Sequence, residues 1–348
     1  MNRKALYQWV SETSKEWQGF SRHFQENVRH FSEGVARVRH SQVRKIAGGV
    51  RGEAESQRRR LQRFVSREVE LAHWFGEWTR SVVKRLAPSE IVLVVDETKL
   101  EDRFGVMVVG LVHAGRCIPL AWRIYIANDS TTYPAEGQVQ LILALLQAVQ
   151  AGLPHHLPVR LLADRGIGTS PDLMVGVMAM GWHFLFRVTK QSKIILPDKQ
   201  SVTFYAQVTA AGQSYQASGR VFKNRGRIPA HVRVLWGAGA HEPWALVTND
   251  ERLTGWEYAQ RFWIEESFRD LKSHGWQVEQ AALRCPQRLE RLWILLVVAY
   301  TWLLLWGCAL TDARRRCLKR GKDGSRLARW SFFRLGWQDF IAYSSHHT

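Results

Sequence analysis

Hydrophobic residues follow two different periods along this chain. Through residues 1–88 they recur at loose helical spacing, as at Phe64 and Leu71, with polar residues between them. That spacing predicts a helical N-terminal region. From Ile91 the pattern changes to short, β-branched apolar runs bounded by Pro and Gly, which predicts strands. The change places a boundary at Pro88 and indicates two parts of different architecture.

The second part alternates strands and helices. The predicted elements are, in order, strands Ile91–Asp96, Val106–His113 and Cys117–Ile126, a helix Gly137–Ala151, a strand Val159–Asp164, a helix Pro171–Met180 and a strand Phe184–Val188. This order of strands and helices builds a mixed sheet with helices packed against it. We therefore expect an α/β domain that begins at residue 89 and includes residues 89–189.

A β-rich stretch interrupts this domain. Residues 190–250 contain alternating segments broken by Gly, Pro and Asn, and these segments are predicted strands: Val202–Val208, Tyr215–Phe222, His231–Trp236 and Trp244–Thr248. Helical sequence follows, so residues 251–312 are expected to complete the α/β domain. The stretch 190–250 is then an insertion within it.

One apolar segment raises the question of a membrane. Leu292–Thr311 is a run of about 20 residues without a charge, long enough to span a bilayer. It is the only such run in the sequence, and basic residues precede it at Arg284, Arg288 and Arg291. We therefore predict a buried central helix and no membrane contact. Residues 313–348 form a C-terminal tail that is first basic and then aromatic.

The charge balance favours a polyanionic partner. The 348 residues include 49 Lys and Arg against 31 Asp and Glu, a net charge of +18, and nucleic acid is the first candidate for such a chain. Basic residues crowd into Arg37–Arg51 and Arg58–Arg67, so residues 1–88 are predicted to be a helical DNA-binding domain. A solvated helical bundle or a subunit contact would show the same pattern, and a basic genome-wide composition would give the same charge.

Cysteine usage and the N-terminus indicate the compartment. The four cysteines form no CxxC pair, and no histidine cluster has zinc-ligand spacing. The first ten residues are polar and lack the apolar core of a signal peptide. Both observations predict a reduced, cytoplasmic protein.

Two aspartates end strand-like runs. Asp96 ends the run IVLVVD and Asp164 ends the run VRLLAD, each followed by polar or Gly-rich sequence. An acid at the carboxyl end of a buried strand lies at the rim of the sheet, where active sites of α/β domains collect. Either aspartate alone is more often a turn residue. Glu97 competes with Asp96, but strand alternation turns it to the opposite face.

A third acid lies in the stretch YAQRFWIEESFRDLK, which is predicted as a helix. At about 100° per residue, Tyr258, Arg261, Glu265 and Lys272 fall within about 60° of arc on one face. Glu266 points well away from this face. A carboxylate flanked by Tyr, Arg and Lys suits a metal ion beside a phosphate, whereas the ordinary alternative is a set of helix-stabilising ion pairs.

Together these motifs resemble DDE transposases with a ribonuclease-H-like core. Asp96, Asp164 and Glu265 match the Asp-Asp-Glu triad, and the four residues from Tyr258 to Lys272 match the Tyr-Arg-Glu-Lys pattern of bacterial insertion-sequence transposases. The likeness covers roughly residues 91–272 and the helix that follows. A β insertion between the second and third acids is also a feature of these transposases. The resemblance implies a ribonuclease-H-like mixed sheet flanked by helices.

The triad implies metal-dependent phosphodiester chemistry. Two Mg²⁺ ions, with Mn²⁺ as a substitute, accept hard oxygen ligands and support cleavage without a protein general base. Asp96 is expected to bridge the two ions, with Asp164 on one and Glu265 on the other. The same site would then join the freed 3′ end to target DNA. The absence of a GxxxxGK[ST] loop is consistent with chemistry that needs no nucleotide.

The resemblance also implies how DNA is held. Tyr258, Arg261 and Lys272 are expected to clamp a phosphate at the element's end, with Arg269 beside them. Relatives pass through a DNA hairpin, act as dimers in a synaptic complex and stack an aromatic side chain on a flipped base. Trp236 and Trp244 are the candidates for that stacking. The implied partners are the terminal inverted repeats and target DNA at the nucleoid.

Two rival functions stay open. The first is a non-catalytic or decayed DNA-binding protein, against which the intact Asp96, Asp164 and Glu265 argue. The second is a ribonuclease-H-like nuclease that cuts without strand transfer, and the clamp residues favour transposition over it.

Overall fold

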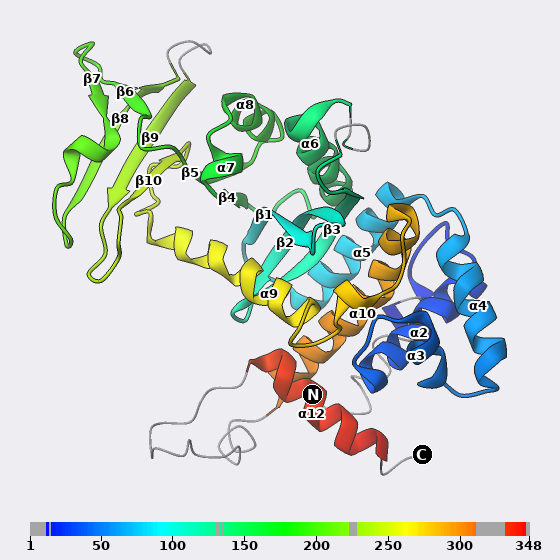
Figure 1. Ribbon diagram of the computed structural model, residues 1–348. Coiled ribbons are helices and arrows are strands. Elements are labelled where there is room, and N and C mark those ends of the chain that lie inside the picture. The colour runs from blue at the N-terminus through cyan, green and yellow to red at the C-terminus, as the bar shows by residue number, and fades with distance from the viewer. Residues whose placement is uncertain are drawn as a thin grey trace, which may run out of the picture.

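A single mixed sheet forms the centre of the molecule. The computed structural model describes residues 12–13, 15–129, 133, 135–222, 228–310 and 331–345. Within these residues ten strands lie in the order β3-β2-β1-β4-β5-β10-β9-β8-β6-β7, flanked by helices (Figure 1). The predicted α/β fold class is confirmed. The strands are β1 (Ile91–Leu100), β2 (Phe104–His113), β3 (Arg116–Ile126), β4 (Val159–Ala163), β5 (His183–Arg187), β6 (Lys193–Ile195), β7 (Ser201–Thr203), β8 (Ser214–Val221), β9 (Ile228–Leu235) and β10 (Trp244–Thr248).

The first five strands make the core of the sheet. β1, β2 and β3 are an antiparallel meander, and β4 and β5 are added parallel to β1. The first six residues of β1 and the first eight of β2 are buried, as the continuous apolar runs predict. Helices α6 (Gly137–Gln150) and α8 (Pro171–Ala179) make the crossovers between the parallel strands. This arrangement brings the ends of β1 and β4 together.

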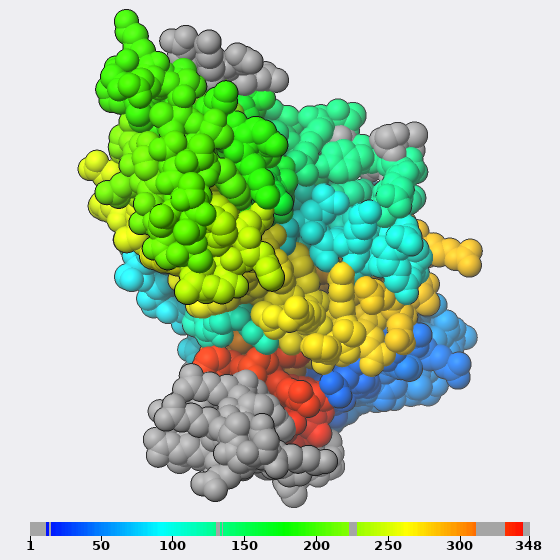
Figure 2. All heavy atoms as spheres, turned by 60° about the vertical axis from the view of Figure 1, so that its left-hand side comes forward, coloured from blue at the N-terminus to red at the C-terminus, as the bar shows by residue number. Residues whose placement is uncertain are grey.

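The β-rich insertion continues the same sheet. β10 pairs antiparallel with β5, and β9, β8, β6 and β7 follow outward. Figures 1 and 2 show these outer strands as a lobe at one end of the molecule. The prediction of one strand over Val202–Val208 was wrong, because β7 ends at Thr203 and a 3₁₀ turn, Phe204–Gln207, follows. That turn carries the Phe204 ring into the core, where it is fully buried.

The N-terminal region is helical, as predicted. It contains α2 (Arg22–Val38), α3 (Val43–Gly48), α4 (Ala54–Ser66) and α5 (Leu71–Leu86). α3 ends at Gly48, and α4 begins at Ala54. α5 is fastened to the sheet by Trp78, whose Nε1 donates to the Pro119 carbonyl oxygen at 2.9 Å. The division of the chain into domains stays a prediction.

Helix α10 (Pro286–Ala309) is the long apolar segment. By length and composition it could cross a membrane, but 89% of its most apolar window is buried inside the molecule, as a central helix would be. Helix α12 (Phe332–Ser345) packs against it so closely that a Cβ on Gly307 would lie 1.8 Å from the Phe332 carbonyl oxygen. The predicted basic run, residues 314–322, lies outside the described residues.

Candidate active site

Asp96 lies inside strand β1 and not at its end. β1 continues to Leu100, paired with β2, so the prediction that the strand ends at Asp96 was wrong. β1 and β2 both extend beyond the end of β4, whose last residue, Ala163, pairs with Val95. Asp96 is therefore level with the end of β4, at the rim of the parallel part of the sheet.

Asp164 follows β4 directly and begins a short helix, α7 (Arg165–Gly168). Its Oδ1 accepts a hydrogen bond from the Ile167 amide at 3.0 Å, as an N-cap residue does. Gly168 lets this turn lie against β5, because a Cβ there would stand 2.7 Å from the Arg187 carbonyl oxygen. The turn thus holds the Asp164 side chain at the rim beside Asp96.

The third acid is carried by a helix that changes type. A 3₁₀ helix, η3 (Trp256–Phe262), runs into α9 (Trp263–Leu271), so the prediction of one α-helix through this stretch was wrong. In a 3₁₀ helix, side chains three residues apart eclipse one another. Tyr258 and Arg261 therefore still share a face, and both turn inward, with exposures of 1% and 8%. Glu265 follows one turn later, with its side chain 44% exposed.

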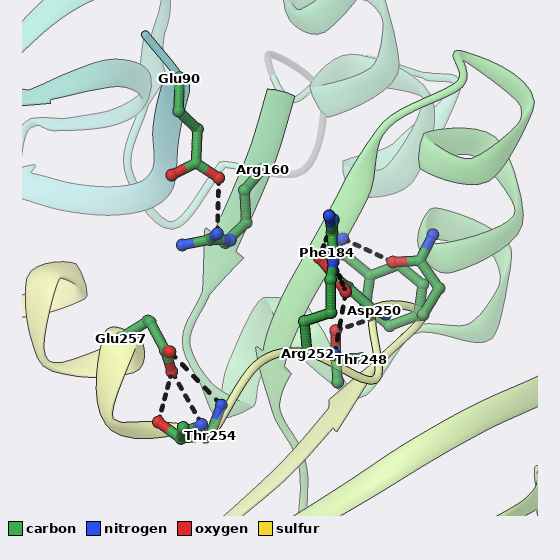
Figure 3. Close-up of polar contacts among 10 residues, drawn as sticks. Glu90, Arg160, Phe184, Thr248, Asp250, Arg252, Thr254 and Glu257 are labelled. Atoms are coloured by element: carbon green, nitrogen blue, oxygen red, sulfur yellow. Dashed lines mark hydrogen bonds and ion pairs between the residues drawn. The ribbon is translucent and has the colours of Figure 1, made fainter. Parts of the chain in front are cut away.

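The loop between β10 and η3 is held by its own polar groups (Figure 3). Asp250 accepts from the backbone amide and the guanidinium of Arg252, at 2.8–3.1 Å. Glu257 accepts from the Thr254 hydroxyl at 3.0 Å. Arg233, 8% exposed, donates to two carbonyl oxygens of the same loop. The entry to the third-acid helix is therefore fixed relative to the sheet.

One guanidinium joins all three acids. Arg261 Nη2 lies 3.1 Å from Asp96 Oδ2 and 3.7 Å from Asp164 Oδ2. Its Nη1 forms an ion pair with Glu265 Oε1. The three acids that the sequence selected, from β1, the end of β4 and α9, thus meet around one buried cation. Glu266 does not join them, because it pairs with Arg269 and Arg116.

Burial dominates the electrostatics of Asp96. It raises the pKa of this carboxyl group to about 6, and the nearby Asp164 and Glu265 carboxylates act in the same direction against the Arg261 charge. Like-charged groups held this close favour a cation between them.

Two members of the predicted phosphate clamp, Tyr258 and Arg261, are buried in this structure. Tyr258 is buried, and its pKa is raised by that burial. Lys272 donates to the Lys99 carbonyl oxygen. Arg269 is the member of the predicted set that stands out into solvent, with its side chain 59% exposed. A role in phosphate binding therefore stays a prediction for all four side chains.

Both aromatic candidates are partly covered, and Trp244 contacts the Tyr258 ring of the site. Trp236 donates from Nε1 to the Ala240 carbonyl oxygen at 2.9 Å, and the Trp244 ring packs 5.2 Å from that of Tyr258. Two other rings of this cluster face outward: Trp256 is 54% exposed and Phe262 is 37% exposed. Sequence reasoning missed both because it searched only the β insertion, although both flank the Tyr258–Arg261 motif.

A buried polar network behind α9 was also missed. Ser267 Oγ accepts from the Cys117 amide at 2.7 Å and from the Tyr300 hydroxyl at 3.2 Å. Arg116 Nε lies 2.7 Å from Asp270 Oδ2. These contacts join α9 to β3 and α10, and so they hold Glu265 in place from behind. Polar residues at the i+2 and i+5 positions after Glu265 are the only sequence signal for them.

The acids fit a divalent cation by chemistry and by shared location. Carboxylate oxygens are the ligands that Mg²⁺ and Mn²⁺ accept. All three carboxylates already lie within ion-pairing distance of the Arg261 guanidinium. In the described residues no group of three potential ligands is arranged to hold a metal as it stands. The guanidinium and a metal ion would therefore compete for the same oxygens.

Comparison with known proteins agrees with this geometry. A family model described as the transposase DDE domain matches residues 91–302, the span from the start of β1 to most of α10. None of the curated proteins matches the chain.

Proposed function

Because this chain belongs to the transposase DDE domain family, we propose that it is an insertion-sequence transposase of the Tyr-Arg-Glu-Lys type. It binds terminal inverted repeats, cleaves DNA at the ends of the element and joins the freed 3′ ends to target DNA. Three acids from separate elements converge on Arg261. This convergence carries the proposal, since an ordinary surface helix would pair Glu265 alone.

Asp96, Asp164 and Glu265 are the proposed metal ligands. Mg²⁺ or Mn²⁺, when bound there, would supply an acidified water and charge stabilisation at the leaving oxygen. The chain's own part is to position the three carboxylates and to keep them neutralised by Arg261 until then. Arg261 must leave the carboxylates for a metal to bind. Its guanidinium would then form two hydrogen bonds with a DNA phosphate beside η3.

DNA binding is proposed to involve two separate regions of the chain. Residues 1–88 supply a basic helical domain, and Tyr258, Arg261, Lys272 and Arg269 supply the phosphate clamp once the site opens. The exposed Trp256 and Phe262 join Trp236 and Trp244 as proposed stacking partners for a flipped base. We extend the proposal to a homodimeric synaptic complex, a hairpin intermediate and a cytoplasmic, nucleoid-associated location.

The experiment is cleavage of a labelled duplex carrying the element's end and its flanking DNA. Wild-type protein with Mg²⁺ should cut at the end and join the product to a plasmid target, and EDTA should stop both reactions. Asp164→Asn should abolish them. Glu266→Gln, which changes the acid that directly follows Glu265 on α9, should keep them. Cutting without joining would favour the nuclease alternative. Tight binding with no cutting under any divalent ion would favour the DNA-binding protein.

A further inference from the structure

A single carboxylate on the β insertion is surrounded by three cations. Glu242 lies in the loop between β9 and β10. Its Oε1 lies 2.5 Å from Arg187 Nη2 and 3.4 Å from Arg165 Nη1. Its Oε2 lies 2.9 Å from Lys190 Nζ. We call Arg165, Arg187 and Lys190 the cation triad; it places three positive charges around one negative charge.

The cation triad stands beside the candidate active site. Arg165 follows Asp164 in the chain, and Arg187 is the last residue of β5. β4 and β5 are parallel, and their register pairs the residues that precede Asp164 and Arg187. Arg165 and Arg187 therefore lie close to each other at the same rim of the sheet. Whatever binds the cation triad lies alongside the three acids.

The side chains around the Glu242 carboxylate have further contacts with the protein. The Arg187 side chain is only 15% exposed. Tyr205 donates to the Pro243 carbonyl oxygen at 2.7 Å, next to Glu242, and its ring lies 5.5 Å from Lys190 Nζ. The Lys190 ammonium, followed by Arg187 and Arg165, lowers the pKa of Glu242, which keeps this carboxylate ionised at neutral pH.

A carboxylate and a phosphodiester offer arginine the same group. Each presents two equivalent oxygens and one negative charge to a planar fork of donors. We propose that the cation triad is a binding site for one backbone phosphate of the DNA strand that runs beside Asp164, and that Glu242 occupies this site when DNA is absent. This inference rests on the proposed function, because it takes DNA as the substrate.

Glu242 is placed so that it can give way. Its side chain is 31% exposed, and it follows loop residues 238–241, which are exposed. One carboxylate also leaves the surplus positive charge of the cation triad unbalanced, and a polyanion would neutralise it. The competing interpretation is a latch, in which Glu242 only fastens the insertion to the catalytic sheet. A latch predicts that loss of the carboxylate costs stability and gains no affinity for DNA.

The test compares Glu242→Gln with wild-type protein in fluorescence anisotropy on the labelled element-end duplex, at several salt concentrations. Removal of the internal competitor should tighten binding about tenfold, or about 1.4 kcal/mol. Arg187→Ala should weaken binding and reduce the dependence of log Kd on log salt by about one unit, the share of one phosphate contact. In the double variant the gain from Glu242→Gln should largely disappear.

Glu90→Gln is the matched control. It removes the same charge from an acid–arginine pair, Glu90 with Arg160 at 2.5 Å, at the opposite end of β4 from Arg165 (Figure 3). General loss of negative charge should change its affinity by no more than about twofold. Thermal unfolding of each variant checks that it is folded.

Three outcomes would overturn the inference. If Glu242→Gln binds DNA no better than Glu90→Gln, the latch is correct and the proposed function still stands. If Glu242→Gln keeps its full gain when Arg187 is also removed, the gain does not arise at this site. If folded wild-type protein binds no DNA, both the phosphate site and the proposed function are wrong.

Discussion

Arg261 and Asp96 form an ion pair in which both side chains are withdrawn from water. Their closest atoms are 3.1 Å apart, and the side chains are 9% and 11% exposed. A buried pair of this kind stabilises mainly because the loss of one partner leaves the other charge uncompensated. Here that partner is shared with two more carboxylates, so loss of Arg261 would leave three acids uncompensated.

Arg261→Ala should therefore lower stability and raise metal affinity. Without the guanidinium, three carboxylates repel one another, and a loss of about 3–5 kcal/mol in the free energy of unfolding is expected. Mn²⁺ should bind the DNA-free variant about tenfold more tightly than wild type, as followed by electron paramagnetic resonance of the free ion. Mn²⁺ should also recover part of the lost thermal stability.

Arg269→Ala is the control for this prediction, because Arg269 lies on α9, which continues directly from η3, but pairs with Glu266. It should leave both Mn²⁺ affinity and stability close to wild type. Weaker Mn²⁺ binding by Arg261→Ala would contradict the competition and would mean that Arg261 orients the carboxylates for the metal.

Ser267→Ala should loosen the helix that carries Glu265. Its hydroxyl oxygen is the acceptor for the Cys117 amide and the Tyr300 hydroxyl, and unpaired buried donors cost about 1–3 kcal/mol each. For the two donors together, we expect urea unfolding to show a loss of about 2–6 kcal/mol, together with a lower cleavage rate. Ser273→Ala, on an exposed residue just beyond α9, should be silent. Equal stabilities of the two variants would show that the network behind α9 is dispensable.

Trp256→Ala should weaken binding to DNA with an unpaired base at the element's end. Its ring is 54% exposed at the edge of the aromatic cluster, and stacking of one base on an aromatic ring contributes about 1–3 kcal/mol. The loss should be larger for a duplex with an unpaired terminal base than for a fully paired one, as measured by competition anisotropy. Trp17→Phe, a change in the N-terminal core, should not discriminate between the two DNAs.

The sequence predicted most elements of the sheet, and it selected three acids that the structure brings together around Arg261, because apolar strand runs and strand-adjacent acids are local signals. It placed Asp96 at a strand end because the apolar run stops there, whereas pairing with β2 extends the strand by four further residues. Helical periodicity could not reveal the 3₁₀ segment that buries Tyr258 and Arg261. Contacts between distant residues, such as Arg261 with Asp164 or Glu242 with the cation triad, depend on sheet order, and no local pattern encodes that order.

The loop that leads into η3 should make stability depend on pH in the acid range. Hydrogen bonds from Arg252 lower the pKa of Asp250 to about 2, from an ordinary value of 3.8. A lowered pKa in the folded state means that the ionised carboxylate stabilises the fold. This contribution is complete above about pH 4 and is lost as the pH falls toward 2. Since the Arg252 side chain is 74% exposed, solvent screening limits the contribution to about 1 kcal/mol.

Asp250→Asn measures this contribution directly. Urea unfolding at pH 6 should show the variant less stable than wild type by about 1 kcal/mol, and the difference should shrink when both are compared at pH 3. Asp198→Asn, an exposed turn residue of the insertion whose carboxylate accepts from the Gln200 amide, controls for the loss of a surface charge. A difference that stays constant from pH 6 to pH 3 would show that Asp250 acts through its shape and backbone hydrogen bond, and not through its charge.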